Sequence, residues 1–229
     1  MAIIDAFLNG PGPLLLEGFA MTVALAVLSL ALAALAGALA AAAKLAGAPA
    51  LRWAADLYTT VFRGVPDIVT ILIVYFAGQR LVNALAGTVG LEGPDVSTFA
   101  AGVIALGLTY GAYMTETFRG AYRAIPAGQI EAARAFGLSR GRTLRRIVAP
   151  QLMRFALPGF TNVWQVLAKA TAVVSVIGLN DLVGLAVKIG RRERDPFTFL
   201  MVVMVAYLLL TSLSGWMLAR AERRLGRGF

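Results

Sequence analysis

Cysteine and histidine are both absent from the 229-residue chain. Without them the chain cannot form disulfides or use a thiolate nucleophile, and it lacks the side chains that most transition-metal sites require. We therefore expect no metal, no cofactor and no catalytic residue. A phosphate-binding loop of the form Gly-x-x-x-x-Gly-Lys-Ser/Thr is also missing, because residues 137–143 have neither the spacing nor the lysine. The chain is not expected to be an enzyme or to hydrolyse ATP by itself.

Charged residues are scarce and hydrophobic residues abundant, at 14% and 59% of the sequence. The apolar residues lie in blocks that are too long for the core of a soluble domain, which indicates an integral membrane protein. Residues 1–17 contain no lysine or arginine, so they lack the basic start of a cleavable signal peptide, and the first block is expected to insert uncleaved. The net charge of +9 lies mostly beside these blocks, which is typical of cytoplasmic flanks rather than of nucleic-acid binding.

Five apolar blocks predict five transmembrane helices and hence an all-α membrane protein. The first block contains 26 residues without a charge, about 39 Å of helix, which is enough to cross a bilayer with some tilt. The predicted spans are residues 18–43, 54–82, 98–119, 155–179 and 196–219, between an extracytoplasmic segment 1–17 and a cytoplasmic tail 220–229. Arginines in the tail and in the connection between the third and fourth spans place the N-terminus outside and the C-terminus inside.

Small residues recur at every fourth position of the first span, at Ser29, Ala33, Gly37 and Ala41. In a membrane such a face lets a neighbouring helix backbone approach closely. The same spacing also arises by chance in an alanine-rich helix, so the sequence leaves both interpretations open.

The connection at residues 125–150 is basic and polar, unlike the blocks around it. Pro126 fits the first turn of a short helix, which Gly137 is expected to end in a left-handed conformation. Ser139 favours the start of a second helix as its N-cap, and Pro150 is expected to stop that helix. The sequence therefore predicts two short helices that meet at a sharp corner.

This connection resembles the EAA signature of ATP-binding-cassette (ABC) importer permeases. The residues that match the signature in type and spacing are Glu131, Ala132, Ala133, Gly137, Ile147 and Pro150. Ala149 departs from the pattern, which usually has leucine before the proline, and leaves the interpretation of two helices and a corner intact. Three further motifs, at residues 62–66, 116–120 and 175–178, are similar to the polar-amino-acid branch of the family and within it to permeases for basic amino acids or opines.

The resemblance implies a type I importer transmembrane domain, a multi-pass inner-membrane permease subunit that forms the path for polar, basic amino acids or opines. It also implies that the connection docks into a separate ATPase, and the six residues expected to couple to it are Glu131, Ala132, Ala133, Phe136, Gly137 and Leu138. The implied partners are two ABC ATPase subunits, a second permease chain, homologous or identical, an extracytoplasmic solute-binding protein and the lipid bilayer. A self-contained ion channel or secondary carrier is the alternative, although no inverted repeat is visible. On charge alone, the connection could instead lie on anionic lipid headgroups.

Charged residues inside the predicted spans form a second candidate site, because each costs about 2.5 to 3.5 kcal/mol at the middle of a span. Asp67 and Lys169 lie at the same predicted depth, about 20 Å from the cytoplasmic side, and Pro66 between the charges of the second span should kink it. Arg63 can pair with Asp67 on its own helix or with Glu116 on the third span. These charges either form ion pairs that fix the helices, or hold the ammonium groups and the carboxylate of an amino acid in transit.

Residues 180–195 interrupt the pattern of basic cytoplasmic connections, because they are charged and lie on the predicted outer side. Apolar residues at helical spacing, with Asp181 as the cap, predict an amphipathic helix on the outer membrane surface. Its basic residues Lys188, Arg191 and Arg192 are candidates for docking the solute-binding protein. The alternative is that this helix only seals the bundle.

Overall fold

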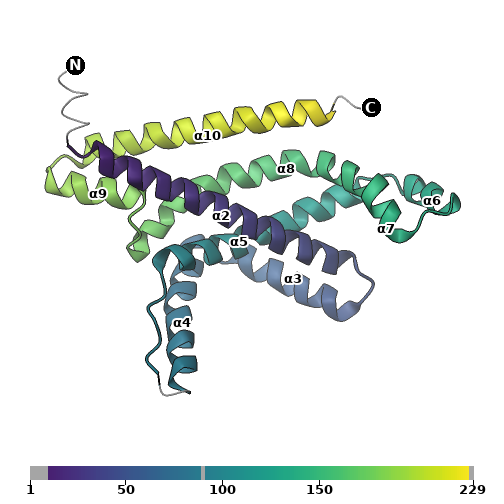
Figure 1. Ribbon diagram of the computed structural model, residues 1–229, viewed down its shortest axis with the longest axis horizontal. Helices are drawn as coiled ribbons and strands as arrows, with labels where there is room; N and C mark the ends of the chain where they lie inside the picture. The colour runs from purple at the N-terminus through teal and green to yellow at the C-terminus, as the bar shows by residue number, and fades with distance from the viewer. Residues whose placement is uncertain (1–9, 89–90, 227–229) are drawn as a thin grey trace.

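The computed structural model describes residues 10–88 and 91–226, and every regular element in those ranges is a helix (Figure 1). The α-helices are α2 (Gly12–Leu45), α3 (Pro49–Gly64), α4 (Asp67–Gly87), α5 (Thr98–Arg123), α6 (Ala127–Ala135), α7 (Arg140–Thr143), α8 (Ala149–Ala170), α9 (Leu182–Arg192) and α10 (Pro196–Gly226). A π-helical turn, η1 (Leu144–Val148), precedes α8, and a 3-10 helix, η2 (Thr171–Ile177), follows it. Residues 1–9 and 227–229, at the outer ends of the predicted N-terminal segment and tail, lie outside the described residues.

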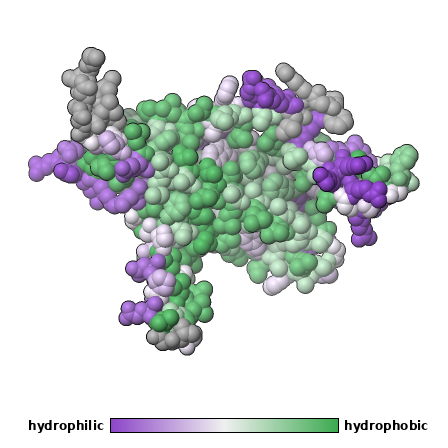
Figure 2. All heavy atoms as spheres, viewed as in Figure 1, coloured by the Kyte–Doolittle hydropathy of each residue, from purple (hydrophilic) through white to green (hydrophobic). Residues whose placement is uncertain are grey.

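Five helical stretches of the described chain are long and apolar enough to cross a bilayer, which confirms the predicted fold class. They are Gly12–Leu45, Asp67–Gly87, Thr98–Arg123, Arg140–Ile177 and Pro196–Arg224. Figure 2 shows a hydrophobic band across the middle of the molecule, with hydrophilic surface gathered near α9 at one end and near α6 and α7 at the other. The start of α2 and the end of α10 lie at these two opposite ends (Figure 1).

The centre of the bundle is the contact between α2 and α5. Ser29, Ala33, Gly37 and Ala41 of α2 are all buried, so the predicted face of small residues is confirmed as a packing face. A Cβ atom added to Gly37 would overlap the Cβ of Met114 on α5. Helices in a bilayer gain little from burying apolar surface, so close dispersion contact of this kind is what holds them together.

The prediction of a single kinked helix for the second span is wrong. The chain breaks at Val65 and Pro66, both in an extended conformation, with Val65 at φ −98° and ψ 134°. Proline disfavours helical geometry in the residue before it, which explains the break. Only α4 is apolar enough to cross a bilayer, whereas α3 is a separate amphipathic helix beside α2 and α5.

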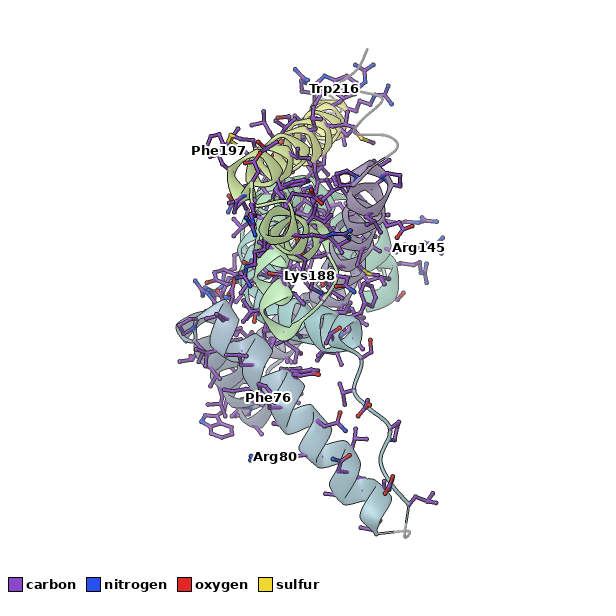
Figure 3. All side chains as sticks on the ribbon, turned by 90° about the vertical axis from the view of Figure 1, so that its left-hand side faces the viewer. Phe76, Arg80, Arg145, Lys188, Phe197 and Trp216 are labelled. Carbon is purple, nitrogen blue, oxygen red and sulfur yellow. The ribbon has the colours of Figure 1, made fainter. Side chains whose placement is uncertain are left out.

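Helix α4 leaves the bundle and projects from it, together with the extended strap of residues 91–97 that returns beside it (Figures 1 and 3). Gln79 fastens the strap to the helix: its Oε1 accepts a hydrogen bond from the Val96 backbone N–H at 2.7 Å, and its Nε2 donates to the Pro94 carbonyl at 3.2 Å. We call α4 and the strap the arm. Few residues of α4 are buried, so most of the arm has no cover from its own chain.

Pro150 does not stop the helix that starts at Arg140, so that expectation is also wrong. The helix continues from Arg140 to Ile177 as the fourth span. Within η1 the turns widen, and the Ala149 N–H donates to the Leu144 carbonyl five residues back. Pro150 follows this π-helical turn almost directly, and the widened turn accommodates a residue that has no N–H and whose ring would crowd the preceding carbonyls.

The amphipathic helix predicted for residues 180–195 is confirmed as α9. Asp181 caps it, with Oδ1 accepting a hydrogen bond from the Gly184 backbone N–H at 2.9 Å. The buried face of α9 packs against α2 and α10, and the Leu182 N–H donates to Thr22 Oγ1 of α2 at 3.1 Å. Helix α9 is thereby fixed to the bundle by a buried polar contact as well as by apolar packing.

Candidate functional site

The connection between the third and fourth spans forms the predicted corner, with α6 and α7 on its two sides. Gly137 has a φ of 75°, the left-handed conformation that glycine adopts without strain. The Leu138 N–H donates to the Ala133 carbonyl at 3.0 Å and the Gly137 N–H to the Arg134 carbonyl at 2.9 Å, which together make a Schellman motif. The sharp end of α6 therefore depends on the glycine.

Two details of this corner differ from expectation. Pro126 precedes α6 as its N-cap residue, with ψ at 126°, rather than lying in the first turn. Ser139 occupies the N-cap position of α7, yet its hydroxyl accepts a hydrogen bond from Arg142 Nε at 3.3 Å instead of from a backbone N–H. Neither difference moves the corner.

The six residues predicted to couple to an ATPase divide into an outer and an inner set. Glu131, Ala132, Phe136 and Gly137 are exposed, and the Phe136 side chain is 86% exposed. Ala133 is buried and Leu138 half-buried, so both face the rest of the protein. A phenylalanine held out at the end of a short helix is a suitable anchor for a hydrophobic pocket on a partner.

A hydrogen-bonded glutamine pair joins α6 to the start of the fourth span. Gln151 Nε2 donates to Gln129 Oε1 at 2.5 Å and to the Ile147 carbonyl at 2.9 Å. The pair links α6 with η1 and α8 across the connection. The sequence interpretation did not identify these glutamines, and only their place on either side of the corner could have indicated them.

The charged residues at one end of α2, α3 and α5 line a polar cleft of about 500 Å³. Lys44 is at its centre: its Nζ lies 2.8 Å from Asp56 Oδ1, 2.8 Å from Glu116 Oε1 and 2.7 Å from Thr59 Oγ1. The Lys44 side chain is only 9% exposed, whereas that of Asp56 is 56% exposed. Glu116 also accepts from Arg119 with its other oxygen. We call the set Lys44, Asp56, Glu116 and Arg119 the inner charge cluster.

A row of aromatic and charged side chains extends from this cleft toward α4. The guanidinium of Arg63 lies 5.3 Å from the ring centre of Tyr113, which stacks on Tyr110 at 5.8 Å. The Tyr110 hydroxyl donates to Asp67 Oδ2 at 2.8 Å. Arg63 also lines the cleft, so the row and the cleft are continuous. Tyrosine faces attract cations, and Asp67 adds a carboxylate at the far end of the row.

The ion pairs expected among the intramembrane charges do not form in this structure. Arg63 contacts Tyr113 rather than Asp67, because the break at Pro66 puts the two charges on different helices. Glu116 pairs with Lys44 and Arg119 instead of Arg63. Lys169 is exposed and has no polar partner among residues 10–88 and 91–226, and Asp67 is bonded to Tyr110.

The sequence interpretation missed five residues of this site: Lys44, Asp56, Tyr110, Tyr113 and Arg119. Lys44 and Asp56 were assigned to a loop and to a helix end, where charge needs no explanation. The two tyrosines are three positions apart on one span, and this spacing on one face of a helix next to an acidic span was the available signal.

The basic residues of α9 lie at the end of the molecule opposite α6. Lys188, which Figure 3 labels, is exposed and donates to Asn180 Oδ1. The Arg192 side chain is 86% exposed and lies 3.9 Å from a Glu193 oxygen, which is a loose surface pair. Arg191 is exposed as well, so the three predicted docking residues are accessible.

The family described as binding-protein-dependent transport system inner membrane component matches residues 33–227. The histidine/lysine/arginine/ornithine transport system permease protein HisQ of Salmonella typhimurium is 43% identical over 221 residues, covering 96% of this chain and 97% of that protein. The nopaline transport system permease protein NocQ of Agrobacterium fabrum is 42% identical, with 96% and 94% covered. The arginine ABC transporter permease protein ArtQ of Escherichia coli is 39% identical, with 90% and 92% covered.

Two solved structures share the fold. An amino acid ABC transporter crystallised with histidines matches with a TM-score of 0.80 at 30% identity, covering 93% of this chain and 94% of that one. The inward-facing MetNI methionine ABC transporter matches with a TM-score of 0.76 at 20% identity, covering 93% and 96%. The resemblance drawn from the EAA signature is confirmed, as is the assignment to the inner membrane, and the alternative of a self-contained channel or carrier is disfavoured. The chain belongs to the family of inner-membrane components of binding-protein-dependent transport systems.

Proposed function

We propose that this chain is the permease subunit of an ATP-driven importer for basic amino acids or opines. The observation that carries the proposal is the match of nearly the whole chain to permeases for histidine, lysine, arginine, ornithine and nopaline. The chain works with two ATPase subunits, a second permease chain and an extracytoplasmic solute-binding protein. The end of the molecule near α6 and α7 faces the cytoplasm, because its arginines follow the positive-inside rule, and the N-terminus is then outside.

The corner between α6 and α7 transmits ATP-driven movement. Phe136 inserts into a groove of the ATPase, and Glu131 pairs with a basic group on its rim. When the ATPase dimer closes, α6 moves with it and carries the Gln129–Gln151 pair along. The fourth span follows, and the bundle changes between inward-open and outward-open states.

The solute path runs along the row from the cleft to Asp67. A cationic side chain passes over the faces of Tyr113 and Tyr110 and is held by the Asp67 carboxylate. The free ammonium group of Lys169 is available for the solute carboxylate, since no residue of the described chain neutralises it. An unpaired charge in a span is expensive, which favours a functional role over a purely structural one.

The arm is the contact with the second permease chain. Its apolar side chains Ile73 and Phe76 are both 57% exposed, and Gln79 and Asn83 lie among them. Gln79 is already bonded to the strap and to Asn83, so the uncovered part of α4 is its apolar surface, against which a second helix would pack.

The experiment is reconstitution of the purified complex in proteoliposomes, with uptake of labelled lysine, arginine, histidine, ornithine and nopaline measured with and without internal ATP. We expect uptake that requires ATP, the ATPase and the solute-binding protein. Uptake by this chain alone would refute the assignment.

Receptor docking on α9 has its own test. Replacing Arg191 and Arg192 by glutamate reverses the charge that would steer an acidic receptor surface. We expect slower receptor-stimulated ATP hydrolysis, most of all at low salt, with basal hydrolysis unchanged. An unchanged response would mean that α9 only seals the bundle.

A further inference from the structure

We propose that the groove between α2, α5 and η1 binds an anionic phospholipid, with an acyl chain in an apolar pocket and the phosphate at a basic pocket beside α6. The inference does not depend on which solute the protein transports. It rests on two adjoining cavities, an unpartnered buried hydroxyl and two unpaired arginines.

The apolar cavity has a volume of about 310 Å³. Ala38, Ala41 and Ala42 of α2 line one side, and Phe118 of α5 and Leu152 of α8 lie across from them. The pocket opens on the outer surface of the helices, since Ala38 and Ala42 are exposed, and its apolar lining gives water no partners. A hydrocarbon chain fits both the size and the chemistry.

The basic cavity has a volume of about 250 Å³ and shares the lining residues Tyr122, Leu144 and Val148 with the apolar one, so the two adjoin. Arg134 of α6 and Arg140 of α7 line its other side. Neither arginine forms an ion pair with a carboxylate among the residues that the structure describes. Glu131, on the same helix as Arg134, is exposed and does not neutralise it.

Thr143 indicates what kind of ligand this cavity would bind. Its side chain is buried, at 6% exposure, its Oγ1 has no hydrogen-bond partner within the described chain, and it lines the basic cavity. A threonine in a helix commonly bonds a carbonyl of the preceding turn, but here the hydroxyl remains free. A buried hydroxyl without a partner is costly, and a phosphate oxygen would accept its hydrogen bond while the two arginines neutralise the charge.

The position of the two cavities favours a lipid over a free anion. The lining of the apolar cavity comes from α2, α5, η1 and α8, whereas that of the basic cavity includes residues of α6 and α7, near which Figure 2 shows hydrophilic surface. A phospholipid of the cytoplasmic leaflet has acyl chains that suit the first lining and a phosphate that suits the second. Acyl chains gain little by leaving lipid for an apolar pocket, so the selectivity of the site comes from the phosphate.

The π-helical turn connects the site to the coupling corner. Leu144 and Val148, which separate the two cavities, both belong to η1, and π-helical turns within α-helices are frequent at functional sites. A bound lipid therefore supports η1 from the membrane side, while the glutamine pair holds it from α6.

The test is lipid binding to the assembled, delipidated permease–ATPase complex, followed by native mass spectrometry. The probes are dioleoyl phosphatidylglycerol, dioleoyl phosphatidylcholine and inorganic phosphate. We expect phosphatidylglycerol to be retained on each permease chain and phosphatidylcholine to be lost. Replacing Arg134 and Arg140 by glutamine should weaken phosphatidylglycerol binding about thirtyfold, and Thr143→Val should weaken it further.

Two variants separate the site from general charge and from a free anion. Arg145→Gln with Arg146→Gln removes the same charge from η1 outside both cavities, and it should leave binding unchanged; Figure 3 labels Arg145. Ala42→Leu fills the apolar cavity from an exposed position and should abolish binding of phosphatidylglycerol, with Ala38→Leu as the substitute if that variant does not assemble. Equal retention of phosphatidylcholine, equal loss in the control pair, or displacement by inorganic phosphate without an effect of the leucine would each overturn the proposal.

Discussion

Replacing Asp181 by asparagine should stabilise the protein at neutral pH and remove a part of its pH dependence. Asp181 is fully buried; its Oδ1 caps α9 and its Oδ2 has no partner within the described chain. Burial raises the pKa of this carboxyl from 3.8 to about 6, although hydrogen bonds from backbone N–H groups of α9 oppose the shift. Asparagine caps a helix about as well as aspartate and carries no charge to bury.

The magnitude follows from the pKa shift. Between pH 3.8 and about 6 the folded protein binds more protons at Asp181 than the unfolded chain does. The free energy of unfolding therefore falls as pH rises through this window, and it levels off above it. A shift of about two units corresponds to about 3 kcal/mol, which sets the largest gain that the asparagine variant can show at neutral pH.

The assay is thermal unfolding of the purified complex, followed by tryptophan fluorescence from about pH 4 to about pH 8. Asp195→Asn is the matched control, because Asp195 is exposed and caps α10 through Thr198. Hydrogen bonds from Thr198 lower the pKa of Asp195, so its contribution to stability is present at neutral pH and is lost as pH falls. If Asp181→Asn lowers stability at neutral pH, or retains the wild-type slope, the account of a buried, unfavourable charge is wrong.

Three further predictions test the candidate sites. Gly137→Val forces a β-branched residue into a left-handed conformation, at a cost of about 1 to 2 kcal/mol, and should abolish ATP-dependent uptake while expression survives; normal uptake would contradict the coupling role of the corner. Lys44→Met leaves Asp56 without its partner and Glu116 with only Arg119, and it should lower the free energy of unfolding by about 1 to 3 kcal/mol, given that Glu116 is partly exposed. Adding Glu116→Gln should recover much of that lost stability in a double-mutant cycle. If no stability is recovered, Lys44 and Glu116 do not stabilise the fold as a pair. Asp67→Asn should leave assembly intact and reduce ATPase stimulation by cationic solutes more than by neutral ones, as should Tyr110→Phe to a smaller degree; equal effects on both solute classes would remove Asp67 from the path.

The fold was predictable where the sequence carries regular patterns. Apolar blocks of sufficient length gave the five spans, and the spacing from Glu131 to Gly137 gave the corner and its family. The small residues of α2 gave a packing face, but not its partner, because a pattern on one helix does not say which helix it contacts.

The errors at Pro66 and Pro150 have one physical cause. The effect of a proline on a helix depends on the conformation of the residues before it, which the sequence pattern does not show. Pro66 follows a residue that can become extended and precedes an acidic helix start, so it breaks the chain where a kink was expected. Pro150 follows a π-helical turn that accommodates it. Because Pro66 was expected only to kink the second span, Arg63 and Asp67 were predicted to lie on one helix. The row through Tyr113 and Tyr110 was therefore missed.

The unbroken helix from Arg140 to Ile177 makes the fourth span a lever. From η1 to Ile177 it is about 45 Å long, so a tilt of about 10° at η1 moves the far end by about 8 Å. If the ATPase docks at the corner as proposed, small displacements there are therefore enlarged at the other end of the span, beside α9. Pro158, inside α8, lacks the N–H that would bond the preceding turn, which makes it the weakest point along the lever. Stiffening that point, for instance with alanine, should change how far the end at Ile177 moves for a given movement at η1.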